Sequence, residues 1–185
     1  MIQTLTNNAE IKREIRMTNL NTYEIKNTNN QVIFSDKFNS FKDCVEAAVS
    51  RKINLEGANL QDANLQGANL QGAYLQGANL QGADLRYVDL ECANLYKCNL
   101  QGAYLQGAYL YKCNLQGANL QGANLKGANL RYVNLQGAYL QGAYLYKCNL
   151  EGAELYKCNL EHANLQDANL KGANLQGAKL ANVKF

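Results

Sequence analysis

The chain lacks several residue types that folds and active sites commonly use. Its 185 residues include no proline, no tryptophan and one histidine, and residues 53–185 contain neither serine nor threonine. No apolar run approaches the ~20 residues that span a bilayer. The N-terminal stretch MIQTLTNNAEIKREIRM has no hydrophobic signal-peptide core and is too mixed in charge for a transit peptide. We therefore expect a cytoplasmic protein without membrane contact, and six reduced cysteines rather than a disulfide framework.

The chain also lacks a large net charge. It carries 18 basic and 15 acidic side chains, and from residue 55 onward the count is ten basic to nine acidic. Binding to the phosphate backbone of a nucleic acid depends on an excess of basic side chains. Direct binding of nucleic acid is therefore not expected.

What the sequence does contain is a five-residue period. Leucine occupies every fifth position from Leu55 to Leu180, 26 times in succession, and Phe185 takes the next place. Two positions before each leucine from Leu60 onward stands Ala, Cys or Val. A helix would spread these leucines around all its faces, and a strand would point them alternately to opposite sides. A chain that turns a corner every five residues keeps them all in one core, which predicts a solenoid of stacked coils.

The repeats resemble the pentapeptide-repeat family, whose motif is roughly A(D/N)LxG. The sequence ANLQG stands at residues 63–67 and again at 68–72, and the match covers about 130 of the 185 residues. The resemblance implies an all-β solenoid, a right-handed quadrilateral parallel β-helix in which residues 20 apart stack. The 27 five-residue units would form nearly seven four-sided coils, roughly 32 Å long at the strand spacing of ~4.8 Å.

The residues before the repeats read differently. Residues 22–27 and 31–35 are β-rich runs separated by TNN, which predicts a hairpin. Ser40 is placed to cap a helix that begins at FKDCVEAAVSRK. We predict a hairpin and capping helix within residues 21–52, which would cover the open edge of the first coil of the solenoid at 53–185. Residues 1–20 would form a short helix or a flexible segment.

Glycine recurs two positions after leucine, where a tight corner favours a residue without Cβ. The same position also holds Tyr87, Lys97, Tyr132 and His162. From this variety we expect that not every corner requires a positive φ.

Four cysteines take the small inward position that alanine usually holds: Cys98, Cys113, Cys148 and Cys158. We expect buried cysteines that act as small hydrophobic residues. Cys92 should face outward and Cys44 should lie on the capping helix, so no pair has the spacing of zinc ligands. The four YKCNL copies that carry the inward cysteines are read as duplicated structural units, with a recurring binding element as the alternative.

Tyrosine is the strongest functional signal. Eleven of the twelve tyrosines lie in the repeats, all at predicted outward positions. Exposed tyrosine is typical of protein-binding surfaces, although tyrosines on flat β faces can also simply pack on their neighbours. The candidate partner surface consists of Tyr104, Tyr109, Tyr111, Tyr132, Tyr139, Tyr144 and Tyr146.

Charged residues are expected to form alternating ladders between coils. Arg131, Glu151 and Lys171 would alternate in sign along one row, and Lys147 would stack on Asp167. Catalysis finds no support, because His162 stands alone and the repeats hold no nucleophile, phosphate loop or carboxylate pair. We therefore predict a protein that is not an enzyme and has no metal or cofactor.

The leading hypothesis is a rigid structural module that presents flat faces to an unidentified protein partner. Leu180, Val183 and Phe185 would be inward residues at an uncapped end. This pattern predicts a homodimer through that end, as relatives of this fold also form.

Two alternatives remain open. Some family members protect DNA gyrase as acidic DNA mimics, but that role needs rows of carboxylates, and only Asp84 and Asp89 place an aspartate just before a leucine. The segment before the repeats also resembles leaders in phage and bacterial repeat proteins. That likeness is compatible with a phage or mobile-element accessory or counter-defence factor.

Overall fold

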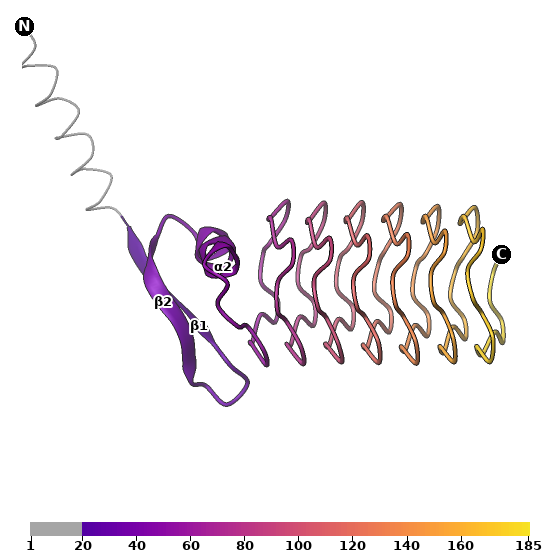
Figure 1. The fold of residues 1–185 in the computed structure, drawn as a ribbon, viewed down its shortest axis with the longest axis horizontal. Coiled ribbons are helices and arrows are strands. Elements are labelled where there is room, and N and C mark those ends of the chain that lie inside the picture. The colour runs from indigo at the N-terminus through magenta and orange to yellow at the C-terminus, as the bar shows by residue number, and fades with distance from the viewer. Residues whose placement is uncertain (1–19) are drawn as a thin grey trace, which may run out of the picture.

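The computed structural model describes residues 20–185. The short helix or flexible segment predicted for residues 1–20 therefore lies outside the described residues, except for Leu20. The described part consists of a small cap followed by a rod of stacked coils, with the cap at one end of the rod (Figure 1).

The cap is an antiparallel hairpin followed by a helix. Strand β1 (Asn21–Lys26) pairs with β2 (Val32–Phe38), and helix α2 spans Phe41–Ser50. Asn27 holds the turn between the strands, because its Oδ1 accepts hydrogen bonds from the backbone N–H groups of Asn29 and Gln31 at 3.0 and 2.9 Å. The Ser40 Oγ accepts from the Asp43 N–H at 3.1 Å. The predicted hairpin and the predicted helix N-cap are both confirmed.

The cap joins the rod through a shared core and a few main-chain bonds. Ile25, Cys44, Val45 and Ala48 are fully buried and continue the apolar core of the coils. The Lys26 carbonyl accepts from Asn59 N–H at 2.7 Å, and Thr28 N–H donates to the Gly57 carbonyl at 3.0 Å. The hairpin thus covers part of the edge that the first coil would otherwise expose.

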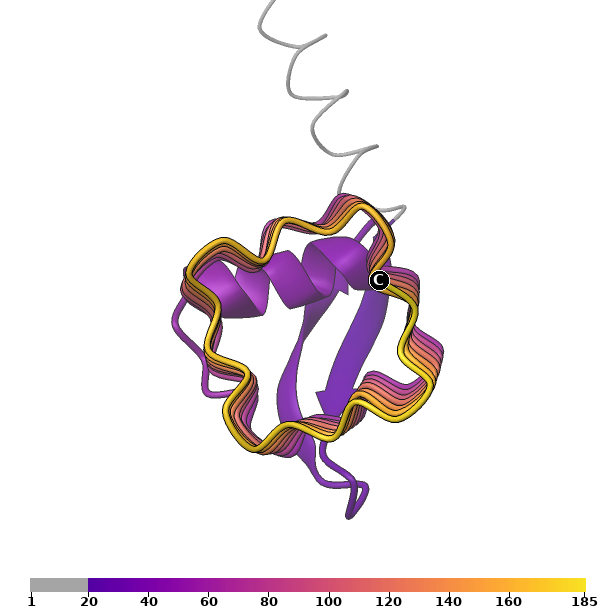
Figure 2. The same ribbon diagram turned by 90° about the vertical axis from the view of Figure 1, so that its right-hand side faces the viewer.

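Each coil of the rod has four sides, and each side is one repeat unit long. Viewed along the rod, the coils superimpose on one four-sided outline, with α2 and the hairpin lying across the far end (Figure 2). Parallel bridges join each side to the same side of the next coil, from Asn59↔Asn79 to Asn164↔Lys184. We number the sides by their leucines: the first side begins with Leu55, the second with Leu60, the third with Leu65 and the fourth with Leu70.

The bridges are isolated, so the expectation of β-helix sheets needs a correction. Within residues 53–185 no side forms a continuous strand. The bridges between coils join only residues that directly precede a leucine or Phe185. The reason is the corner in every repeat unit, which leaves too few extended residues on a side for a longer run.

The main chain of a typical repeat unit is almost completely hydrogen-bonded. The N–H of the leucine and that of the corner residue two positions later donate to carbonyls of the next coil, as in Leu100→Asn119 and Gly102→Gln121. The N–H before the leucine donates to the previous coil, and the N–H of the small residue closes the turn. Bonds between coils measure 2.7–3.1 Å. Main-chain N–H groups that the rod removes from water therefore have hydrogen-bond acceptors in neighbouring coils or in their own turn.

The interior of the rod is apolar, as the repeat pattern predicts. Every leucine from Leu55 to Leu165 is at most 2% exposed, and no polar or charged residue is buried among the described residues. Burying a leucine side chain contributes about 1.5–3 kcal/mol, so the stack is stabilised coil by coil.

All 26 corners, each two positions after a leucine, have a positive φ between 53° and 69°. Fifteen are glycines and eleven are other residues, Tyr87, Lys97, Tyr132 and His162 among them. The expectation that some corners escape positive φ is therefore wrong. The turn geometry fixes the left-handed conformation, and a side chain at this position bears the strain.

A matched pair of lysines tests this strain. Lys97 lies at a corner with φ 55°, whereas Lys126 lies one position earlier in its turn, and each places its ammonium over a tyrosine ring. We expect Lys97→Gly to raise the free energy of unfolding by about 0.5–1 kcal/mol, because the left-handed strain of about 1–2 kcal/mol outweighs the lost cation–π contact. Lys126→Gly should lower it by a similar amount. Denaturant titration measures both, and two changes of the same sign would contradict the argument.

Candidate protein-binding surface

In most repeat units a side chain accepts a hydrogen bond from the fifth main-chain N–H. At 19 positions directly before a leucine stands Asn or Asp, and in every case its Oδ1 accepts from the N–H two residues later, at 3.0–3.3 Å. This contact is an Asx turn. It explains why asparagine dominates this position although its side chain faces outward.

Five tyrosines occupy that same position and cannot make the bond: Tyr74, Tyr104, Tyr109, Tyr139 and Tyr144. Two residues after three of them, the side-chain oxygens of Gln76, Gln106 and Gln141 are buried without a hydrogen-bond partner. Leaving buried polar atoms unpaired is unfavourable. Tyrosine therefore stands at these positions against the local preference of the fold.

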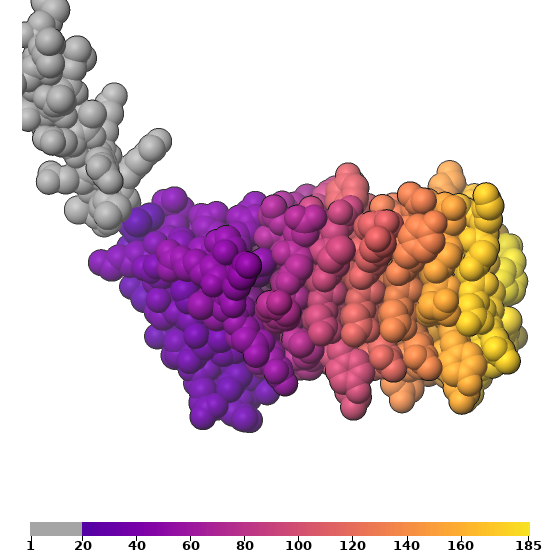
Figure 3. Space-filling model, in the orientation of Figure 1, coloured from indigo at the N-terminus to yellow at the C-terminus, as the bar shows by residue number. Residues whose placement is uncertain are grey.

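Three tyrosines lie around the corner between the third and fourth sides. Tyr104 and Tyr109 flank Gly107 on one coil, and the ring of Tyr87 from the coil before lies against Gly107, where an added Cβ would come within 2.7 Å of the ring. The three side chains are 51%, 50% and 60% exposed in the order Tyr104, Tyr109, Tyr87. Figure 3 shows a few large side chains projecting from a rod whose coils otherwise form even, parallel ridges.

A second pair continues this surface along the fourth side. The rings of Tyr111 and Tyr132 make an edge-to-face contact with their centroids 5.9 Å apart. Tyr132 lies against Gly152 of the next coil, and Arg131 stacks 5.5 Å from the Tyr132 ring centroid. These contacts restrict the orientation of the two rings.

The remaining candidates are divided between two sides. Tyr144 lies on the third side, two coils beyond Tyr104, and the Tyr146 ring is contacted by the ammonium groups of Lys126 and Lys147 at 5.7 and 5.0 Å. Tyr139 lies on the second side, between Asn119 and Asn159, and is separate from the others. We call the set on the third and fourth sides and their corners the tyrosine surface: Tyr87, Tyr104, Tyr109, Tyr111, Tyr132, Tyr144 and Tyr146.

Sequence reasoning missed Tyr87. Tyr87 lies at a corner, and the residue at the same corner of the next coil is Gly107. A glycine in this place indicates that the tyrosine ring packs where a Cβ would otherwise lie. Tyr132 shows the same relation to Gly152. Tyr74, also absent from the predicted set, is 50% exposed on the first side near the cap.

The four YKCNL copies share one structure. In each, the lysine lies at a positive-φ corner and its ammonium contacts the ring of the preceding tyrosine, with distances of 4.8–5.1 Å to the centroid. The cysteine replaces the inward alanine, and its thiol donates to a leucine carbonyl of the preceding coil. Each copy thus combines a tyrosine–lysine pair on the surface with a cysteine in the core.

The inward cysteines are buried and unreactive in character. Burial raises the pKa of Cys98, Cys113, Cys148 and Cys158 to about 12, so that these thiols stay protonated in neutral solution. Burial also raises the pKa of Cys44. Cys92 is exposed, and none of the six is in a disulfide.

Ion pairs on the rod are few. Arg131 Nε lies 3.2 Å from Glu151 Oε2, as predicted, but within residues 20–185 no ion pair joins Glu151 to Lys171 or Lys147 to Asp167. Arg86 pairs with Asp84, and its hydrogen bonds hold the pKa of that carboxyl below the usual value. Two of the acidic side chains on this surface are therefore already neutralised by a basic neighbour.

The far end of the rod exposes apolar side chains. Leu180 is 39% and Phe185 65% exposed, whereas Val183 is half-buried. In this last coil the N–H groups of Leu170, Leu175 and Leu180 have no acceptor among the described residues, and the carbonyls of Ala168, Ala173 and Ala178 have no donor there.

Residues 20–185 contain no group of three or more His, Cys, Asp or Glu side chains placed to hold a metal ion. His162 lies at a corner on the second side. None of the helices in this part of the chain has the length and apolar character needed to span a bilayer.

Comparison with known proteins identifies a family model and several similar solved structures. The pentapeptide repeats family matches residues 53–91, 89–127, 123–161 and 148–185, in eight copies. A pentapeptide repeat protein from the Arabidopsis thaliana thylakoid lumen is 30% identical, over 57% of this chain and 70% of that chain, with a TM-score of 0.38. One from the cyanobacterium Cyanothece is 27% identical, over 71% and 87%, with a TM-score of 0.37. A plasmid-mediated fluoroquinolone resistance protein is 22% identical, over 65% and 78%, with a TM-score of 0.37.

No curated protein matches the chain. The family match covers the whole rod and more than half of the sequence. The chain therefore belongs to the pentapeptide repeat family, whose quadrilateral β-helix accounts for the four-sided coils.

The cysteines give a direct test of the inward assignment. Native protein treated with iodoacetamide at mildly alkaline pH should be alkylated at Cys92 alone, because the other five thiols are buried and four have a pKa of about 12. All six should react after denaturation. Intact-mass and peptide mass spectrometry measure both results, and rapid modification of Cys113 in the folded protein would show that the rod is not packed as described.

Proposed function

We propose that this protein is a non-enzymatic scaffold that binds a protein partner through the tyrosine surface. The observation that carries the proposal is the replacement of asparagine by tyrosine at a repeat position where Asn or Asp otherwise makes an Asx turn. Tyr104, Tyr109 and Tyr144 each forgo that bond and present a half-exposed ring instead. Their presence is better explained by recognition than by folding.

The physical properties of the surface fit this role. Tyrosine combines a large apolar ring with a hydroxyl and loses little conformational entropy on binding. The contacts of Tyr87 with Gly107, and of Tyr111 with Tyr132, hold several rings in place on a rigid rod. Preorganised aromatic side chains of this kind commonly dominate the binding energy of an interface.

The charge distribution supports protein binding over DNA mimicry. A mimic needs rows of unpaired carboxylates at phosphate-like spacing, whereas Asp84 is paired with Arg86 and Glu151 with Arg131. The lysines over Tyr111 and Tyr146 make the surface mixed in charge. The six unpaired cysteines support the cytoplasmic location proposed from the sequence.

We also propose that a second copy covers the last coil, in a homodimer through Leu180, Val183 and Phe185. The face offers apolar side chains together with free main-chain donors and acceptors, so two copies related by a two-fold axis could pair with each other.

Multi-angle light scattering tests the dimer. At micromolar concentration we expect twice the monomer mass, and the double variant Leu180→Lys, Phe185→Lys should elute as a monomer, because like charges would be buried at the interface. A monomeric mass for the unaltered protein would overturn the proposal.

The tyrosine surface is tested by the triple variant Tyr104→Asn, Tyr109→Asn, Tyr144→Asn. Each change restores a possible Asx turn worth about 0.5–1.5 kcal/mol, so the melting temperature should be unchanged or higher. In quantitative affinity capture the triple variant should lose at least tenfold of the specifically retained protein.

The matched control changes Gln81, Gln101 and Gln121 to Ala on the second side, a face built of asparagine and glutamine over these coils. The control should retain the partner as the unaltered rod does. Equal capture by all three proteins would contradict the proposal, and because the triple variant is expected to be at least as stable, a loss of capture cannot be attributed to unfolding.

A further inference from the structure

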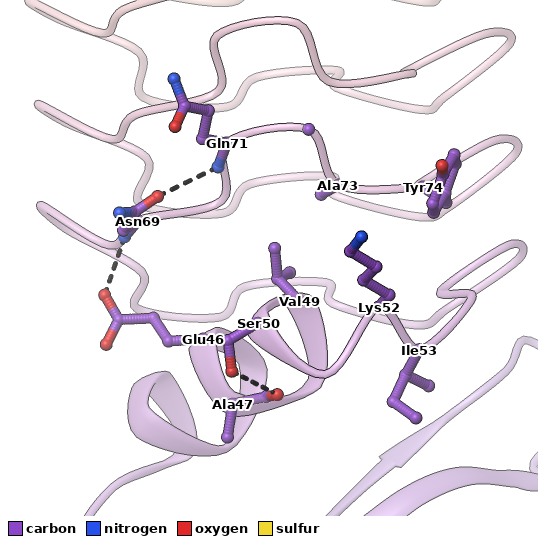
Figure 4. A pocket seen from close by; sticks show the side chains of 11 residues that line it. Glu46, Ala47, Val49, Ser50, Lys52, Ile53, Asn69, Gln71, Ala73 and Tyr74 are labelled. Atoms are coloured by element: carbon purple, nitrogen blue, oxygen red, sulfur yellow. Dashed lines mark hydrogen bonds between the residues drawn. The ribbon is translucent and has the colours of Figure 1, made fainter.

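A cavity lies between helix α2 and the first coil. Its volume is about 630 Å³, within the range of small-ligand sites. One wall is formed by Glu46, Ala47, Val49 and Ser50 of α2 together with Lys52 and Ile53, and the other by the coil segment from Asn69 to Tyr74. Figure 4 shows the helix on one side of the cleft and this segment on the other.

The cleft exists because the chain departs here from the regular hydrogen bonding between successive coils. In the coils, each leucine and corner N–H donates forward to the next coil, as Leu75 does to Asn94, and each residue before a leucine donates backward, as Asn94 does to Ala73. If this pattern continued before the first coil, the N–H groups of residues 50 and 52 would donate to the carbonyls of Asn69 and Gln71. The Tyr74 N–H would donate to the carbonyl of residue 53. Instead α2 continues to Ser50, and Lys52 N–H closes the helix by donating to the Val49 carbonyl at 2.9 Å.

Three main-chain groups of the coil segment are left unpaired as a result. The carbonyls of Asn69 and Gln71 receive no hydrogen bond from residues 20–185, and Tyr74 N–H finds no acceptor there. Their neighbours are bonded: Asn69 N–H donates to Glu46 Oε1 at 2.7 Å, and Ala73 N–H to the Leu70 carbonyl at 3.1 Å. Two acceptors followed by one donor are the pattern that an added parallel strand would satisfy.

The charges at the two ends of the cleft give such a strand a direction. A strand parallel to residues 69–74 would have its amino end beside Asn69 and its carboxyl end beside Tyr74. Glu46 lies at the Asn69 end with one carboxylate oxygen still available, and Lys52 reaches toward the segment of Ala73 and Tyr74 (Figure 4). Lys52 forms no ion pair within residues 20–185.

We propose that this cleft binds a peptide segment of a partner chain that adds to the hydrogen-bond ladder along residues 69–74 and turns with them at Gly72. The segment carries a basic group at its amino-terminal side, toward Glu46, and a carboxylate at its carboxyl-terminal side, toward Lys52. The site is separate from the tyrosine surface, so either can fail without the other.

The test uses two synthetic peptides of equal composition and opposite direction. Lys-Ala-Asn-Ala-Glu should bind the full chain with saturable NMR shifts at Tyr74, and amide hydrogen exchange at Tyr74 should slow at least fivefold. The amides of Asn69 and Ala73 serve as internal controls, because both are already bonded. The reversed peptide, Glu-Ala-Asn-Ala-Lys, should bind at least fivefold more weakly.

Two variants test the charges separately from the ladder. Glu46→Gln keeps an oxygen that can accept from Asn69 N–H but removes the negative charge, and Lys52→Gln removes the positive charge. Each should weaken binding of the first peptide at least fivefold, while unchanged resonances of the second side show that the rod remains folded. Absence of binding at millimolar peptide would overturn the proposal. So would equal binding of the two peptides, or binding that depends on Lys52 without protecting Tyr74, which would indicate a simple anion contact.

Discussion

The main-chain ladder between coils is the constraint on which the rest of this structure depends. Every repeat unit must direct two N–H groups forward, one backward and one across its own turn, and it has only five residues in which to do so. The corner with positive φ, the inward leucine and the small residue before it all follow from this requirement. The outward positions are what remains free for function.

The asparagine before each leucine is part of that constraint, although it faces solvent. Its Oδ1 completes the hydrogen bonding of the main chain, so a different residue at this position has a structural cost. This makes the exceptions informative in a way that ordinary surface residues are not. Tyr104, Tyr109 and Tyr144 stand where folding alone favours asparagine. On the same two sides, Tyr87 and Tyr132 pack on glycines of the next coil.

Much of the fold was predictable because it repeats. The period of Leu55 to Leu180 predicted the length of one side and the inward residues, and the family resemblance implied four sides to a coil. Ser40 marked the start of α2. The φ at corners such as Tyr87 was predicted wrongly, because a varied residue type was taken as a sign of a varied conformation. The cleft beside α2 could not be foreseen, since it depends on where the helix ends relative to the ladder, which local sequence patterns do not specify.

The equivalence of the coils has a consequence for how such a rod can change in length. Inserting or deleting four repeat units together would add or remove one full coil, and every residue beyond it would keep its side and its stacking partners. Inserting a single unit would preserve the core equally well but rotate everything beyond it by a quarter turn. Tyr144 and Tyr146 would then move to the next side around the rod, and Tyr144 would no longer align with Tyr104. Gaining or losing a single unit leaves the packing of the core unchanged. A surface that spans several coils keeps its arrangement only when whole coils are gained or lost.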